Sequence, residues 1–112
     1  MSECVFCKLI KGGVSRGILY EDEDVIAFPD IFPKYKIHVL IIPKKHLVSV
    51  LDASPKDDDI LGKMLRVGGK IAREKGIADD GFRLLTNTGE NAGQSVQHLH
   101  VHLLGGEKLR AI

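Results

Sequence analysis

The sequence lacks an excess of charge of either sign. Among its 112 residues, 16 lysines and arginines oppose 15 aspartates and glutamates, so the formal net charge is +1 at pH 7. A protein that binds nucleic acid across its surface usually carries a strongly basic face. The balance argues against a nucleic-acid partner, and any bound anion must therefore be held by a local site.

Long apolar runs and cysteines are scarce as well. No stretch reaches the roughly 20 apolar residues that span a bilayer, so we expect no membrane partner. The first residues, Met1 to Cys4, do not combine a basic segment with an apolar core as a secretion signal does, and we expect a cytoplasmic protein. Only Cys4 and Cys7 are present, and a reducing compartment disfavours a structural disulfide between them.

The remaining composition is that of an ordinary globular domain. The apolar fraction is 44%, and a chain of this length buries about two-thirds of its unfolded surface, so we predict a single domain over residues 1–112. The predicted strands are 18–20, 25–28, 37–42, 82–87 and 97–104, and the predicted helices are 4–11 and 54–75. A long helix inserted between mostly antiparallel strands indicates the α+β class.

Two of these segments carry further expectations. Segment 37–42 is almost continuously apolar, which predicts a central strand covered on both faces. The long helix has a capping box at its start, in Ser54-Pro55-Lys56-Asp57, and an apolar stripe that includes Leu65. Gly68-Gly69 lies inside this helix at a cost of about 1 kcal/mol per glycine relative to alanine, which predicts a close approach of another backbone.

Three of the five histidines alternate with apolar residues in the last predicted strand. Successive side chains of a strand point to opposite faces, so His98, His100 and His102 would share one face. Imidazole serves proteins as a metal ligand, a general acid or base, and a nucleophile. The plain alternative is a solvated strand face, which three alternating histidines beside a loop of Gly, Ser and Asn disfavour.

The loop before this strand supplies groups that bind phosphate. Exposed amides of residues 89–95 and the Ser95 hydroxyl can hold phosphate oxygens without net positive charge. Asn87 and Gln94 add further donors. Together with the histidines, these groups indicate a phosphate-centred site in which His100 attacks phosphorus.

Three other positions have two interpretations each. Asp30 can meet two ribose hydroxyls or merely order a turn. His38 can belong to the site or be a satisfied core histidine. The Cys4-x-x-Cys7 spacing suits zinc, if two further ligands complete a tetrahedron, but it also fits two reduced cysteines packed under a short helix.

The sequence also resembles a known family over nearly its whole length. Residues 94–104 resemble the signature of the histidine triad (HIT) superfamily, in which histidines alternate with apolar residues. Residues 28–33, 38–46 and 105–106 are similar to the branch of histidine triad nucleotide-binding proteins, the Hint-like purine nucleoside phosphoramidases.

The resemblance implies a fold and an activity. The fold is HIT-like, with a five-stranded mostly antiparallel sheet, one long and one short helix, and a sheet continued across a homodimer. The activity is hydrolysis of nucleoside 5′-phosphoramidates or acyl-nucleoside monophosphates. A covalent nucleotidyl-histidine forms on His100, and water then releases the nucleoside monophosphate. Purine nucleotides are the implied ligands.

The resemblance also implies a role for each site residue. His102 and His38 contact or polarise the phosphate, the His98 carbonyl holds the N–H of His100, and Ser95 lies near the leaving amine. The implied nucleotide contacts are Phe28, Asp30, Ile31, Asn87, Gly93, Gln94, Ser95, Val96, His100 and His102. The implied ligands of a structural zinc are Cys4, Cys7, His46 and His98, and no catalytic metal is required.

Three alternatives remain open from the sequence. A dinucleoside polyphosphate hydrolase of the same superfamily would use the same histidines. A nucleotide-binding adaptor with little catalysis would use the same binding groups. A metalloenzyme would use the three alternating histidines as metal ligands.

Overall fold

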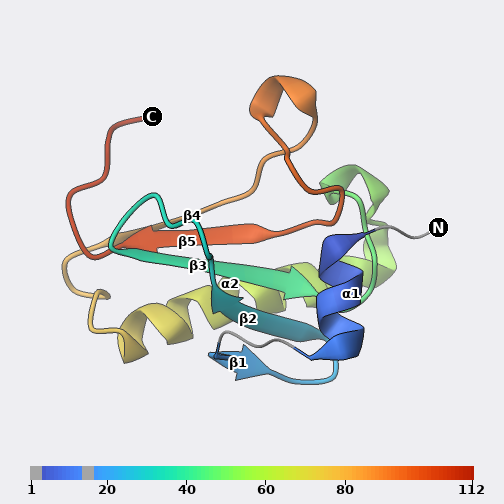
Figure 1. The fold of residues 1–112 in the computed structure, drawn as a ribbon, viewed down its shortest axis with the longest axis horizontal. Coiled ribbons are helices and arrows are strands. Elements are labelled where there is room, and N and C mark those ends of the chain that lie inside the picture. The colour runs from blue at the N-terminus through green and yellow to red at the C-terminus, as the bar shows by residue number, and fades with distance from the viewer. Residues whose placement is uncertain (1–3, 14–16) are drawn as a thin grey trace.

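The computed structural model describes residues 4–13 and 17–112. Figure 1 shows its helices and strands in order: α1 (Val5–Gly12), β1 (Tyr20–Glu21), β2 (Val25–Pro29), β3 (Ile37–Pro43), α2 (Asp58–Glu74), β4 (Phe82–Leu85) and β5 (Val101–Gly105). Short 3-10 turns occupy Val50–Asp52, Pro55–Asp57 and Glu90–Ala92. The predicted α+β class is confirmed. In the described part of the chain, no helix is long and apolar enough to cross a membrane.

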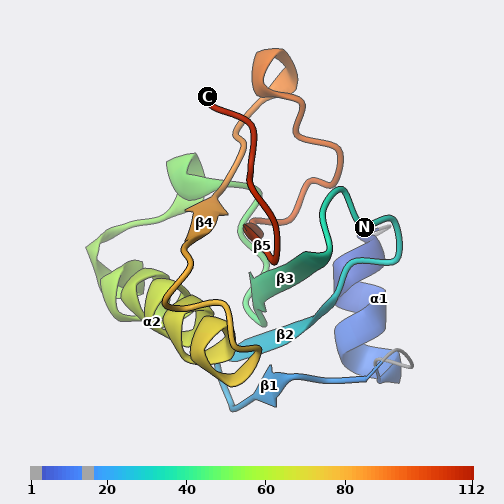
Figure 2. The same cartoon turned by 90° about the vertical axis from the view of Figure 1, so that its left-hand side faces the viewer.

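The strands form one sheet in the order β1-β2-β3-β5-β4. Every neighbouring pair is antiparallel. The sheet separates the two helices, with α2 on one face and α1 on the other (Figure 2). The sheet therefore has a separate core on each side, and β3 lies at its centre.

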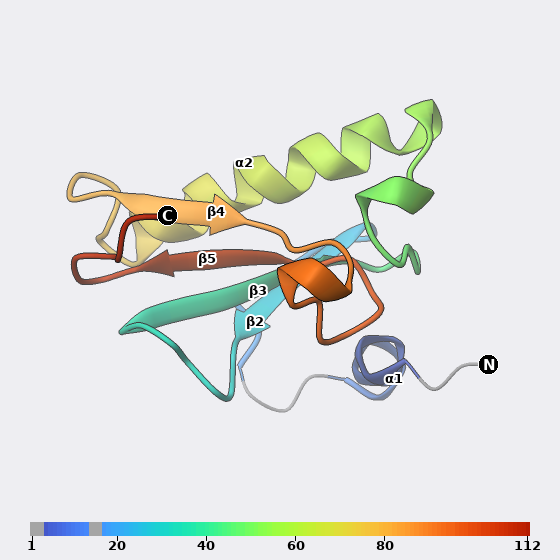
Figure 3. The same ribbon diagram turned by 90° about the horizontal axis from the view of Figure 1, so that it is seen from above.

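Alternating residues of β3 feed the two cores. Val39 and Ile41 pack into the cluster that contains Met64, Val67 and Ile71 of α2. Leu40 and Ile42 pack into the other cluster with Phe6 of α1 and Phe28 of β2. Each face therefore receives every second side chain of the strand, which confirms the prediction of a strand covered on both faces. Seen from above, the strands run between the two helices (Figure 3).

The start of α2 depends on a buried carboxylate. Asp57 Oδ2 accepts a hydrogen bond from the Ser54 amide at 3.0 Å, and its Oδ1 accepts one from Lys45 Nζ at 2.6 Å. The ion pair with Lys45 lowers the pKa of Asp57. The predicted capping box is present, but it closes the 3-10 turn, and the α-helix begins one residue later.

Two expectations for α2 need correction. Leu65 is 54% exposed and does not belong to the buried stripe. Gly68 does mark a close approach, but to side chains: a Cβ there would lie 2.7 Å from Leu84 Cδ2 and 3.3 Å from Ile41 Cδ1. A Cβ at Gly69 would meet nothing within 4 Å. Only the first glycine is therefore required by packing.

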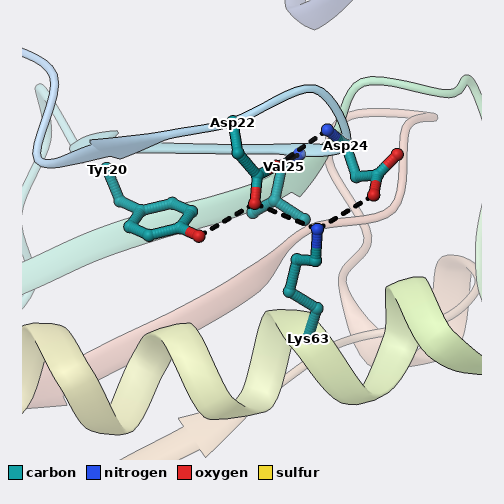
Figure 4. Close-up of polar contacts among 5 residues, drawn as sticks. All are labelled: Tyr20, Asp22, Asp24, Val25 and Lys63. Atoms are coloured by element: carbon teal, nitrogen blue, oxygen red, sulfur yellow. Dashed lines mark hydrogen bonds and ion pairs between the residues drawn. The ribbon is translucent and has the colours of Figure 1, made fainter.

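The β1–β2 hairpin is tied to α2 by Lys63, which contacts the carboxylates of Asp22 and Asp24 (Figure 4). Asp22 Oδ1 accepts hydrogen bonds from the amides of Asp24 and Val25, at 2.8 and 2.9 Å. Its Oδ2 accepts one from the Tyr20 hydroxyl at 2.8 Å and one from Lys63 Nζ at 3.0 Å. Lys63 Nζ also donates to Asp24 Oδ2 at 2.9 Å. Because Lys63 comes from α2, it holds the turn and the helix together through two carboxylates.

The last two strands are shorter than predicted. β5 begins at Val101, so His98 and His100 precede the strand. The register that pairs Ile41 with Val101 would place Pro43 opposite Leu99, and a proline has no amide proton for the ladder. Leu99 donates instead to the Leu47 carbonyl at 2.6 Å. β4 ends at Leu85, and the next residue, Thr86, bonds the His100 carbonyl through its hydroxyl.

Candidate functional site

A pocket of about 920 Å³ opens on the face of the sheet that α1 covers. Its wall combines α1, the loop that follows β2, the middle of β3 and β5, the loop that follows β4, and the C-terminal segment. The volume falls within the range of small-molecule sites, roughly 300–1,000 Å³. Six parts of the chain therefore converge on one cavity.

The alternation of the histidine row survives outside the regular strand. The rings of His98 and His100 contact Phe6 edge-on, with centroids 5.8 and 5.3 Å apart. The intervening Leu99 lies in the opposite core, together with Val101. The predicted common face of the histidines is therefore present, although only His102 belongs to β5.

The protonation of His100 is fixed by a backbone carbonyl. His100 Nδ1 lies 2.7 Å from the His98 oxygen, and a carbonyl can only accept, so Nδ1 carries the proton. In the neutral ring, Nε2 then bears the lone pair. The Thr86 hydroxyl donates to the His100 carbonyl at 2.7 Å and steadies the backbone. His100 lines the pocket, so the arrangement provides an oriented nitrogen nucleophile.

A backbone amide fixes His38 and His102 in the same manner. The Lys34 amide donates to His38 Nδ1 at 3.0 Å, so the proton of neutral His38 is on Nε2. That nitrogen lies 2.9 Å from His102 Nδ1, which must accept. The proton of neutral His102 is consequently on Nε2. His102 lines the pocket, and this N–H is a donor available to a phosphate oxygen.

Both of these rings are neutral at pH 7. Burial lowers the pKa of His102 to about 4, assisted by the neighbouring His100 and His38. Burial also lowers the pKa of His38, opposed by the Asp30 carboxylate and supported by the Lys34 charge. A neutral ring holds one proton. The Lys34 amide therefore fixes one chain of donors, in which it donates to His38 and His38 donates to His102.

Most of the residues expected to bind nucleotide come together in the pocket. Those that line it are Asp30, Ile31, His38, Asn87, Gly93, Ser95, Val96, His100 and His102. Two expected contacts lie elsewhere. Phe28 has no exposed surface and packs against Phe6. Gln94 accepts from the Gly89 amide and donates to the Val48 and Val96 carbonyls, so it shapes the loop.

Several pocket residues were not expected from the sequence. They are Val5, Phe6, Leu9, Phe32, Lys34, Tyr35, Leu40, Leu85, Leu104 and Arg110. The apolar face of the first helix was visible in the sequence, but nothing local indicated that it would cover a nucleotide-sized cavity. Arg110 follows the last motif, Gly105-Gly106, and is held near the pocket by a hydrogen bond from its amide to the Tyr35 hydroxyl at 3.4 Å.

A second cluster brings the two cysteines to two histidines. Ligand atoms of Cys4, Cys7, His46 and His98 all lie within 4.8 Å of one another. The separations include 3.3 Å from Cys4 Sγ to His98 Nδ1 and 3.1 Å between the Nδ1 atoms of His46 and His98. Tetrahedral zinc, with bonds of about 2.0–2.3 Å, separates its ligand atoms by roughly 3.3–3.8 Å. The four atoms therefore fit such an ion.

The tautomer of His98 agrees with this arrangement. Its Nε2 lies 2.8 Å from the Pro43 carbonyl and must donate to it, which leaves the Nδ1 lone pair facing the cysteines. Burial lowers the pKa of His98, so the lone pair is retained at pH 7. The Pro43 carbonyl thus orients this ring in the way that outer hydrogen bonds orient metal-binding histidines.

A third group, Asp30, His38 and His102, is also close enough to hold a cation. Its chemistry is unsuitable, because His38 Nδ1 already accepts the Lys34 amide proton. The Nε2 of His38 is therefore protonated and has no lone pair for a metal. This group acts as a hydrogen-bond chain in the described structure.

Comparisons with known proteins agree with the fold. A family model described as the HIT domain matches residues 12–109. The chain is 45% identical over 107 residues to the purine nucleoside phosphoramidase of Escherichia coli K12, covering 96% of this chain and 90% of that protein.

Solved structures give the same result. A HIT family hydrolase from Clostridium thermocellum superimposes with a TM-score of 0.94 at 46% identity, covering 100% of this chain and 97% of that one. A histidine triad protein from Clostridium difficile gives 0.93 at 42% identity, with the same coverage of both chains. The chain belongs to the HIT domain family.

Proposed function

We propose that this protein hydrolyses nucleoside 5′-phosphoramidates and related acyl-nucleoside monophosphates through a covalent intermediate on His100. The observation that carries the proposal is the His98 carbonyl 2.7 Å from His100 Nδ1, which directs the unprotonated Nε2 toward the pocket. The name of the similar E. coli protein, a purine nucleoside phosphoramidase, supports the substrate class. Family membership supports a nucleotide as the ligand.

In the first step, His100 Nε2 attacks phosphorus. A nitrogen–phosphorus bond forms to the ring, the bond from phosphorus to the leaving nitrogen breaks, and the leaving nitrogen takes up a proton from solvent water and departs as the amine. The His102 Nε2–H donates to a phosphate oxygen, where negative charge grows in the transition state. Ser95 and Asn87 line the same pocket and are placed to hydrogen-bond the leaving nitrogen and the phosphate.

In the second step, water attacks the phosphorus of the nucleotidyl-histidine. The nitrogen–phosphorus bond breaks, the nucleoside monophosphate is released, and His100 returns to its neutral form. The His98 carbonyl stabilises the positive charge on the ring during both steps, because it accepts a hydrogen bond from Nδ1–H throughout. The cycle needs no catalytic metal.

The nucleoside part of the substrate meets a polar side chain and an apolar wall of the pocket. Asp30 Oδ1 accepts a hydrogen bond from the Phe32 amide at 2.8 Å, and Oδ2 lies 3.4 Å from His38 Nε2. The carboxylate is only partly exposed, at 18% of its side-chain surface, and can accept hydrogen bonds from the ribose hydroxyls. Ile31, Phe6 and Leu9 form the apolar wall against which a purine base stacks.

The choice between two members of the superfamily is decided by turnover. We expect adenosine 5′-phosphoramidate to be hydrolysed with a higher kcat/KM than diadenosine polyphosphates. A higher kcat/KM for the polyphosphates would replace the proposed substrate class with the dinucleoside polyphosphate hydrolases. Tight nucleotide binding without turnover of either substrate would favour the adaptor.

We also propose that Cys4, Cys7, His46 and His98 hold a structural zinc ion. The ligand spacing and the Nδ1 lone pair of His98 support this assignment. Both cysteines precede the residues matched by the family model, so the metal would be an addition to the common fold. When bound, the ion would join the first helix to the sheet, and no catalytic step passes through it.

A homodimer is the third part of the proposal. β4 lies at one edge of the sheet, so one side of its backbone is unpaired within the chain, and Leu65 of the adjoining α2 is 54% exposed. Pairing of two β4 edges would continue the sheet and cover apolar surface. Light scattering should give twice the mass of the chain, and Leu65→Glu should reduce it toward the monomer.

A further inference from the structure

The basic residues of the pocket lie at one end, and its acidic residue is Asp30. Among the described residues that line it, Lys34 and Arg110 are the only lysine or arginine. The two buried histidines beside the reacting centre, His38 and His102, are neutral because their pKa values are lowered. Within residues 4–13 and 17–112, neither Lys34 nor Arg110 has an acidic partner. Lys44 and Lys63, by contrast, form ion pairs with carboxylates.

The rings of His38 and His102 lie between the backbone of Lys34 and the ring of His100. The Lys34 amide bonds His38. The ring of His38 lies 5.1 Å from that of His102, and the ring of His102 lies 5.0 Å from that of His100. The phosphate attacked by His100 is therefore at one end of a histidine row, and the backbone of Lys34 is at the other.

The C-terminal segment brings the second cation to the same place. β3 begins where β5 ends, because Ile37 pairs with Gly105 (Figure 1). The segment after β5 returns over the loop before β3 and is held there by the hydrogen bond between the Arg110 amide and the Tyr35 hydroxyl. Two cations from opposite sides of a strand pair thus border one end of the cavity.

We propose that Lys34 and Arg110 form a subsite for a second anionic group of the substrate, remote from the phosphorus that His100 attacks. This inference rests on the proposed function. The ligand class is a nucleotide that carries a carboxylate or phosphate in addition to the reacting phosphate. Two positions have this chemistry: a carboxylate on the leaving amine, and a 3′-phosphate on the ribose.

Matched ligands separate the two positions. The first pair is the adenosine 5′-phosphoramidate of β-alanine and that of β-alaninamide, which differ by one negative charge on the leaving group. The second pair is adenosine 3′,5′-bisphosphate and AMP, which differ by the 3′-phosphate. Dissociation constants are measured for all four ligands, and kcat/KM for the two phosphoramidates.

The variant is K34Q/R110Q, and the matched control is K36Q/K108Q. The control removes the same charge from neighbouring positions that do not line the pocket. The wild-type protein should prefer the anionic member of at least one pair by about fivefold, the effect of two exposed charge pairs. The preference should disappear in K34Q/R110Q and persist in the control.

Two results would overturn the subsite. One is a wild-type protein that prefers the anionic member of neither pair, and the other is a preference that survives in K34Q/R110Q. The failure of the proposed function would look different, because neither phosphoramidate would be turned over by any of the proteins. The dissociation constants would then still decide the subsite.

Discussion

Backbone groups determine what each imidazole of the site can do. The His98 carbonyl, the Lys34 amide and the Pro43 carbonyl each contact one ring nitrogen, at 2.7, 3.0 and 2.8 Å. A carbonyl accepts and an amide donates, so each contact fixes a tautomer. His100 is thereby left with a nucleophilic Nε2, while His98 keeps a lone pair for a metal. The backbone groups beside them therefore give these histidines different chemical roles.

The hydrogen-bond chain through His38 gives the first prediction. Glutamine at position 38 can accept from the Lys34 amide and donate to His102, whereas leucine can do neither. We expect His38→Leu to lower kcat by about tenfold, because His102 loses the donor that fixes its tautomer, and His38→Gln to retain most activity. Nitrogen NMR shifts of His102 should reveal mixed tautomers in the leucine variant alone. Equal losses of kcat in both variants would show that the chain has no such role.

The sequence predicted the reactive residues better than their surroundings. Histidines and cysteines are rare enough for their spacing to be informative, and the structure brings Asp30, His38, His100 and His102 into one pocket. The family resemblance implied the contact of the His98 carbonyl with His100, but the tautomers of His38, His98 and His102 were not predictable, because they depend on carbonyl and amide groups that every residue has. Phe28 was misplaced because an aromatic side chain serves a core as well as a ligand site.

Helix α1 has few means of attachment to the sheet. Phe6 is its one buried residue, and Leu9 and Ile10 pack partly buried beside it. Cys4, at the N-cap, and Cys7 belong to the proposed metal cluster. The same helix supplies Val5 and Leu9 to the pocket wall. Loss of the metal should therefore loosen the wall of the nucleotide site as well as the helix.

Removal of the metal gives the second prediction. Chelation should lower the Tm by about 5 °C, the effect of losing a ligand that binds only the folded state, and should weaken AMP binding. Cys7→Ser should contain no zinc and should not respond to the chelator. Lys11→Gln, in the exposed last turn of α1, should behave as the wild type. Purified protein without zinc, or a Tm that chelation leaves unchanged, would contradict the proposed metal site.

The adjacent glycines of α2 give the third prediction. Gly69→Ala adds a methyl group in open space and should raise the free energy of unfolding by about 0.5–1 kcal/mol through helix propensity. Gly68→Ala places its Cβ 2.7 Å from Leu84 Cδ2 and should lose that gain to overpacking. Urea unfolding should therefore separate the two variants by at least about 1 kcal/mol. Equal stabilities would mean that Leu84 moves aside without cost.

The extent of each strand was less predictable than its existence. Each of the five predicted strands has a counterpart, because apolar runs mark what the two cores bury. The first is shifted, since β1 is Tyr20–Glu21 and shares only Tyr20 with the predicted segment 18–20. The ends depend on pairing partners: β5 starts late since Pro43 lies across from Leu99, and β4 stops early where Thr86 bonds the His100 carbonyl. Such cross-strand relations are absent from any local pattern.

Across the molecule, Asp22 and Asp24 link the hairpin to Lys63 of α2, and Asp22 accepts the larger number of hydrogen bonds. Burial opposes the ionisation of Asp22, but its four hydrogen bonds outweigh burial and hold the pKa well below the usual value. A lowered pKa means that the folded state binds the proton more weakly than the unfolded state. The contribution of Asp22 to stability is therefore complete above about pH 4 and is lost as the pH falls further.

The fourth prediction follows from this pH dependence. The free energy of unfolding should fall between about pH 4 and pH 2, and Asp22→Asn should make the fall shallower while lowering stability at pH 7. Glu23→Gln, an exposed change in the same turn, should leave the slope as it is in the wild type. Urea titrations at several pH values measure the slope. An unchanged slope in Asp22→Asn would assign the acid sensitivity to other groups.

The nucleophile at position 100 is the centre of the proposed activity, and a trapped adduct tests it most directly. Rapid acid-free quenching during turnover of a nucleoside 5′-phosphoramidate, followed by intact mass spectrometry, should show a nucleoside monophosphate bonded to the protein, and peptide mapping should locate it on His100. His100→Asn should bind AMP but form no adduct and lose turnover by about 10³-fold or more. An adduct on another residue, or full turnover by His100→Asn, would contradict the assignment.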